Sequence, residues 1–169
     1  FDQEMKRRGH RVVRYADDIV ILKRTRAAAE NAMAQARTLL EDQLRLTVNR
    51  EKTGLMSARK GVPYLGVVIR YSSISIQPKR LARFKLKVKA ATRRNSPVNL
   101  KRVIEDINPL LRGFSAYYRV ANCKSVLGDL MKWIRRRLRA KQLKLWKKPR
   151  TLHRRLRQLG YKGDFQFIS

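Results

Sequence analysis

The sequence has few cysteines and histidines and no long apolar stretch, which are features that disulfide-bonded, metal-binding and membrane-spanning proteins depend on. Its single cysteine, Cys123, excludes an internal disulfide and favours a reducing compartment. Its two histidines, His10 and His153, lack partners at metal-ligand spacing, and they give no convincing Ser-His-Asp set. No stretch reaches about 18 uncharged apolar residues, which predicts that no helix spans a membrane. The first residues also lack the basic and apolar regions of a signal peptide.

Acidic residues are scarce as well. The 169 residues include 42 Lys and Arg but 12 Asp and Glu, which gives a formal net charge of +30. Self-repulsion of this size is tolerated mainly when a polyanion neutralises it, so nucleic acid is the expected partner. An anionic membrane surface and a merely solubilising basic surface remain weaker alternatives. Residues 1–78 hold 15 basic and 8 acidic residues and residues 79–169 hold 27 and 4, which predicts two parts with a boundary near Pro78.

The first part has the pattern of an α+β fold. We predict a helix over 3–8, two strands around a break at Asp17-Asp18, and a helix over 25–45 with Thr25 as its N-cap. The small apolar residues of that helix indicate close packing on a sheet. The two strands cover 11–16 and 19–23, and further strands are predicted at 44–49, 53–58, 62–71 and 72–78.

The second part is predicted to be all-α. After Pro78 the strand signals end, and apolar residues recur at helical spacing among many cations. We predict helices over 79–94, 99–121, 124–146 and 151–159. The chain is therefore expected to combine an α+β part at 1–78 with a helical part at 79–169.

The adjacent carboxylates Asp17 and Asp18 interrupt an apolar, β-branched run. Two carboxylates among apolar strands are costly unless something compensates their charge, and Mg²⁺ favours carboxylate oxygens. Two such ions can activate an attacking hydroxyl and stabilise a leaving phosphate. An ordinary solvated turn with two acidic residues is the alternative.

Three stretches carry a resemblance to a known family. "RYADDIVIL" resembles the Tyr-x-Asp-Asp hairpin of reverse transcriptases, in the form common in group II intron-encoded proteins. "REKTGLMSARKGVPYLGVVI" resembles the family's Lys-Thr segment before a Phe/Tyr-Leu-Gly strand, and "INPLLRGFSAYYRVA" resembles its maturase-specific thumb, with Phe114 where Trp is usual. The resemblance implies a partial reverse-transcriptase palm, with a β-hairpin, a helix and further antiparallel strands at 1–78, and an all-α maturase-specific thumb at 79–169.

The resemblance also implies roles for individual residues. Asp17 and Asp18 would bind catalytic Mg²⁺, and Lys52 would lie near the nucleotide phosphates, with a role as general acid as a hypothesis. Tyr15 and Ala16 would lie near the primer end, and Leu65-Gly66 would form a turn beneath the primer. Arg112, Gly113, Phe114, Tyr117 and Tyr118 would belong to a thumb helix, in which one of the two tyrosines packs inward while the other could stack on an RNA base. The high positive charge of residues 79–169 also predicts RNA contacts for four clustered arginines, Arg135, Arg136, Arg137 and Arg139.

Two functions follow from the resemblance. One is RNA-directed DNA synthesis with Mg²⁺ on an RNA template and DNA primer, and the other is a maturase role in which the chain binds group II intron RNA and assists splicing. The sequence reads as a C-terminal fragment without the third palm aspartate and the fingers, so the chain alone is expected to be inactive as a polymerase. An RNA-binding splicing factor, an unrelated basic RNA-binding protein and a gene remnant are the alternatives. A bacterial cytoplasm or an organelle, no membrane partner, and a homodimer are further expectations.

Overall fold

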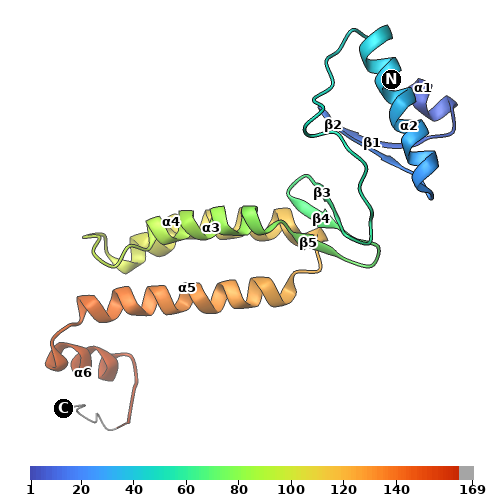
Figure 1. Ribbon diagram of the computed structural model, residues 1–169. Helices are drawn as coiled ribbons and strands as arrows, with labels where there is room; N and C mark the ends of the chain where they lie inside the picture. The colour runs from blue at the N-terminus through green and yellow to red at the C-terminus, as the bar shows by residue number, and fades with distance from the viewer. Residues whose placement is uncertain (164–169) are drawn as a thin grey trace. The chain divides into compact units, whose positions relative to one another are not determined.

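The computed structural model describes residues 1–163. The chain divides into two compact units, Phe1–Ser73 and Ile74–Ser169, which are described in turn (Figure 1). The first unit contains short antiparallel strands and helices, and the second is mostly helical, so the predicted α+β class is confirmed.

The first unit begins with a short helix and a β-hairpin. Helix α1 covers Asp2–Arg7, and strands β1 (Arg11–Tyr15) and β2 (Asp18–Leu22) pair antiparallel, with Val13 opposite Val20 and Tyr15 opposite Asp18. The turn therefore consists of Ala16 and Asp17, and the predicted break at Asp17-Asp18 is wrong by one residue. Ala16 has a φ of +53°, and a two-residue hairpin needs positive φ in its loop to match the strand twist.

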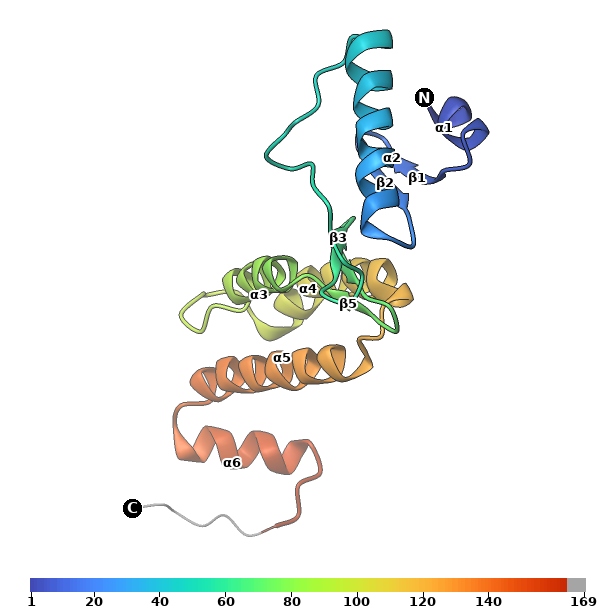
Figure 2. The ribbon, with the colours of Figure 1, turned by 45° about the vertical axis from the view of Figure 1, so that its right-hand side comes forward.

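Helix α2 (Arg26–Thr38) covers the hairpin in both ribbon views (Figure 2). The N-cap prediction is confirmed, since the amide of Ala28 donates to Thr25 Oγ1 at 3.2 Å. Ala32 and Ala36 are buried, and the short side chains let the helix approach the strands closely. A π-helical turn, η1 (Leu39–Gln43), continues α2 and carries the buried Leu39. Met5, Ala36 and Leu39 form the core, with Phe1, Val12 and Ile21 packed against it.

The second half of this unit differs from the prediction. Residues 44–49 and 53–58 form no strand in the described chain, and most of them are exposed. Extended backbone becomes a strand only when another strand pairs with it, and an alternating sequence does not reveal the partner. Strands β3 (Val62–Tyr64) and β4 (Val67–Ile69) form a second hairpin, so the single strand predicted over 62–71 is wrong.

The second unit starts with strand β5 (Ile74–Ile76) and then holds four α-helices among its described residues. Helices α3 (Pro78–Ala91), α4 (Leu100–Tyr117) and α5 (Lys124–Leu145) lie side by side, and α6 (Pro149–Gln158) follows α5 (Figures 1 and 2). A 3₁₀ turn, η2 (Tyr118–Val120), ends α4. The four helix predictions are confirmed. Their shared core consists of Phe84, Val88, Val103, Ile107, Leu130 and Ile134.

Candidate nucleic-acid interface

The tip of the first hairpin exposes the residues of the Tyr-Ala-Asp-Asp stretch. Asp17 and Asp18 are exposed, and Tyr15 is 65% exposed. The backbone behind them is held by Arg14, whose Nη1 donates to the carbonyl of Ala16 at 3.4 Å and whose Nη2 lies 2.7 Å from Asp2 Oδ2. The hydrogen bond from Arg14 lowers the pKa of Asp2 below its usual value. The sequence thus places two accessible carboxylates at the tip of a hairpin, and the Arg14–Asp2 ion pair supports the turn.

These two carboxylates fit a magnesium site in part. Mg²⁺ is commonly held by one or two carboxylates, with substrate phosphates and waters as its other ligands. Asp17 and Asp18 can supply such carboxylates because both are exposed at one hairpin tip. Residues 1–163 contain no group of three His, Cys, Asp or Glu side chains that could hold a metal. The pair can therefore contribute ligands, but it does not make a closed protein cage.

Lys52 lies in the segment between η1 and β3. It sits in an exposed turn, where the amides of Glu51 and Lys52 both donate to Asn49 Oδ1. Among the described residues, no hydrogen bond or ion pair joins Lys52 to Asp17 or Asp18. Its role beside the nucleotide phosphates stays a prediction.

Leu65 and Gly66 form the two-residue turn between β3 and β4. Their φ angles are +46° and +81°, the combination that a tight hairpin turn of type I′ uses. Gly66 tolerates this conformation, whereas Leu65 adopts it with a Cβ and is strained. Strain of this kind commonly marks a functional position.

Helix α5 has an inner and an outer face, and they divide the predicted arginine cluster. Arg137 lies on the inner face, where its Nε donates to Thr92 Oγ1 at 2.7 Å and its Nη2 donates to the carbonyls of Lys89 and Thr92, both at 3.2 Å. Its guanidinium also lies over the ring of Trp133, 5.3 Å from the centroid. These contacts hold the C-terminal end of α3, where the helix dipole favours a cation. Nε and Nη2 of Arg137 are thus engaged within the protein, and its contact with RNA stays a prediction.

Lys141 extends this inner face and is not among the residues predicted from the sequence. It is 1% exposed, and its Nζ donates to the carbonyls of Arg93 (3.2 Å) and Ser96 (3.0 Å) in the α3–α4 loop. Lys144 Nζ donates to Asn95 Oδ1 in the same loop. A signal was present, because Leu130, Ile134, Arg137 and Lys141 recur at helical spacing on one face.

The outer face of α5 carries the remaining cations. Arg135, Arg136 and Arg139 are exposed, and residues 132, 135, 136 and 139 are spaced so that they share one side of the helix. Lys132 is in an exposed ion pair with Asp129 at 3.2 Å. No ion pair of Arg135, Arg136 or Arg139 occurs in the described part of the chain. Three guanidinium groups are thus presented together to solvent.

The two adjacent tyrosines have different environments. Phe84 stacks on Phe114 (centroids 3.9 Å apart), Phe114 contacts Tyr118 (4.6 Å), and Tyr118 meets Tyr117 edge-on (4.9 Å). Tyr118 is 5% exposed, and burial raises the pKa of its phenol. Tyr118 is therefore the tyrosine that packs inward, and its covered ring offers RNA little surface. Tyr117 is 58% exposed and stays a candidate, as does the exposed Arg112.

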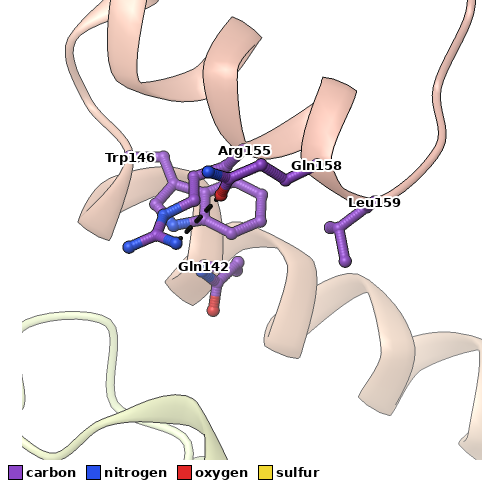
Figure 3. A pocket seen from close by; sticks show the side chains of 5 residues that line it. All are labelled: Gln142, Trp146, Arg155, Gln158 and Leu159. Atoms are coloured by element: carbon purple, nitrogen blue, oxygen red, sulfur yellow. Dashed lines mark hydrogen bonds between the residues drawn. The ribbon is translucent and has the colours of Figure 1, made fainter.

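A pocket between α5 and α6 contains none of the predicted site residues. Figure 3 shows its lining side chains, and the Nη1 of Arg155 donates to Gln158 Oε1 at 3.1 Å across its α6 side. The pocket has a volume of about 310 Å³. It is lined by Gln142, Trp146, Arg155, Gln158 and Leu159.

Comparisons with known families match the first and the second half of the chain to two different family models. Residues 1–69 match the family model of reverse transcriptase (RNA-dependent DNA polymerase), and residues 81–160 match the group II intron, maturase-specific domain. A comparison with curated proteins found no significant match. Within residues 1–163, the structure contains no helix with the length and apolar character needed to cross a bilayer.

Proposed function

Because this chain belongs to the group II intron-encoded reverse transcriptase and maturase family, we propose that its helical unit binds group II intron RNA through the outer face of α5. Its two domains imply binding to intron RNA and to template and primer in general. Arg135, Arg136 and Arg139 are the proposed phosphate contacts, with Arg112 and Tyr117 on α4 as additional ones.

The exposed arginines of α5 are the observation that supports this proposal. Their guanidinium groups lie on one face, and the opposite face of the same helix is packed in the core. A rigid helix therefore holds the three cations in a fixed pattern, which suits the regular spacing of phosphates. Each phosphate contact releases counterions, so binding of this kind weakens steeply as salt rises.

The test is a filter-binding titration of the whole chain on group II intron RNA at several salt concentrations. Changing Arg135, Arg136 and Arg139 to Gln together should reduce the slope of log affinity against log salt by about 0.7 to 0.9 for each lost contact. The matched control changes three exposed arginines of the first unit, Arg11, Arg24 and Arg59, to Gln. This control removes the same charge and should leave the slope of log affinity against log salt nearly unchanged. An equal reduction of the slope in the two triple variants would contradict the proposal that RNA binds the outer face of α5.

A second function belongs to the first hairpin. The reverse transcriptase family generally uses divalent metal, and we propose that Asp17 and Asp18 supply carboxylate ligands to Mg²⁺. When bound, the metal would stabilise charge on phosphates. In this proposal Tyr15, Ala16, Leu65 and Gly66 contact primer or nucleotide, and Lys52 contacts the nucleotide phosphates. The supporting observation is that both carboxylates are exposed on a supported turn.

The two functions can be separated by one pair of substitutions. Asp17→Ala with Asp18→Ala should leave intron RNA affinity unchanged, because the carboxylates contribute nothing to phosphate binding by α5. Splicing assistance that survives the double change would support the maturase role. Loss of RNA affinity in this variant would place the RNA site at the hairpin instead. A bacterial cytoplasm or an organelle, and a homodimer, remain proposals.

A further inference from the structure

We propose that the pocket between α5 and α6 accepts one unpaired RNA base that stacks on Trp146. The inference rests on the proposed RNA binding and adds a site to it. The pocket is formed where Trp146 ends α5 and α6 packs back toward it (Figure 3). Its volume of about 310 Å³ lies at the small end of the range for small-molecule sites, as expected for a single heterocycle.

The lining groups suit a base better than they suit an aliphatic side chain. Trp146 is half-buried, and an indole offers a flat apolar face on which any base can stack. Gln142 and Gln158 carry amides that both donate and accept, as the edge of an unpaired base requires. The Nη1 of Arg155 donates to Gln158 Oε1 at 3.1 Å, which restrains that amide. The pocket thus combines a stacking surface with polar groups able to bind a base edge.

The charge around the pocket favours nucleic acid over a peptide. Residues 144–157 contain seven Lys or Arg and no Asp or Glu. No acidic side chain lines the pocket itself, so nothing there repels the phosphates on either side of an inserted base. In A-form RNA, paired bases are stacked and inaccessible to such a pocket, so bulged or looped nucleotides are the expected ligands.

The test compares two RNA hairpins of equal length and charge, one fully paired and one with a single bulged adenosine. The whole chain should bind the bulged hairpin more tightly. Trp146→Leu should weaken that binding by about 10- to 100-fold, the usual loss of one stacked base. It should leave both the affinity for the paired hairpin and the salt slope unchanged. Trp146→Phe keeps an aromatic face and should recover most of the loss.

A fluorescence measurement covers the case in which Trp146→Leu misfolds. In Trp133→Phe, Trp146 is the only indole, and stacking on the bulged base should quench its emission while the paired hairpin should not. Equal wild-type affinity for both hairpins, or no quenching, would overturn the pocket assignment. If the pocket assignment fails but both hairpins bind with the expected salt slope, the proposal that the outer face of α5 binds RNA still stands. If neither binds, the proposed RNA binding itself fails.

Discussion

The ammonium nitrogen of Lys141 lies 3.0 Å from the carbonyl oxygen of Ser96, although the lysine side chain is 1% exposed. A lysine is rarely this buried unless its charge is compensated. Here the carbonyls of Ser96 and Arg93 accept hydrogen bonds from it, and both belong to the loop between α3 and α4. The lysine therefore fastens a loop to α5, and in this very basic protein it is a structural cation.

Lys141→Met should lower the free energy of unfolding of the helical unit by about 1–3 kcal/mol, because two loop carbonyls lose a charged donor. Urea unfolding followed by the fluorescence of Trp133 and Trp146 measures the change. The control Lys87→Met removes an equal charge from an exposed position of α3 and should change stability by less than about 0.5 kcal/mol. Equal effects of both substitutions would show that the buried hydrogen bonds contribute nothing.

Arg137 and Thr92 should be energetically coupled. A double-mutant cycle with Arg137→Gln and Thr92→Val should give a coupling free energy of about 0.5–3 kcal/mol, because Nε donates directly to Oγ1 at 2.7 Å. Thermal and urea unfolding provide the four stabilities. Arg136→Gln is the matched control, since this neighbouring arginine is exposed. Arg136→Gln should weaken RNA binding without changing stability. A coupling free energy near zero between Arg137 and Thr92 would favour an RNA contact for Arg137.

The strained turn at Ala16 should be relieved by glycine. Ala16→Gly should stabilise the first unit by about 0.5–1 kcal/mol, because glycine adopts a φ of +53° without a Cβ clash. The same substitution at the exposed helical position Ala34 should destabilise by about 1 kcal/mol. Chemical unfolding followed by backbone NMR signals of β1 and α2 distinguishes the two. Destabilisation by Ala16→Gly would mean that the alanine methyl makes contacts that outweigh its strain.

Acid should weaken helix α1. The side-chain hydrogen bonds from Arg7 and then Arg8 lower the pKa of Glu4 from 4.5 to about 2. Because the folded pKa lies below the unfolded one, the ion pairs stabilise fully above about pH 4.5, and this stabilisation is lost as pH falls toward 2. A carboxyl-carbon NMR titration should place the Glu4 midpoint near 2. Arg7→Gln with Arg8→Gln should return it toward 4.5, and a wild-type midpoint already near 4.5 would contradict the ion pairs.

Manganese should report the proposed metal ligands. Added Mn²⁺ should broaden the NMR signals of Tyr15 to Asp18 before those of other segments, because these are the two exposed carboxylates at one turn. Asp17→Asn with Asp18→Asn should remove the selective broadening, and excess Mg²⁺ should reverse it in the wild-type chain. Broadening centred instead on Glu41 and Asp42 would assign the affinity to another acidic pair.

Much of this protein follows from local sequence. Thr25 caps α2 because its hydroxyl reaches an amide three residues on, and the four helices after Pro78 follow from apolar residues at helical spacing. The charge of the second part and the exposed Asp17-Asp18 pair also need no tertiary information. Local hydrogen bonds and side-chain periodicity determine these features, so the sequence alone predicts them.

Which residues of a pattern face inward depends on tertiary packing. Arg135, Arg136 and Arg137 form one run in the sequence, yet the third holds the end of α3 while the other two face solvent. In the same way, Tyr118 completes an aromatic stack and Tyr117 does not lie in the core. The segments 44–49 and 53–58 have strand-like sequences but form no strand in the described chain. In each case the outcome depends on a distant partner, a helix end, a ring or a neighbouring strand, and local sequence does not specify where that partner lies.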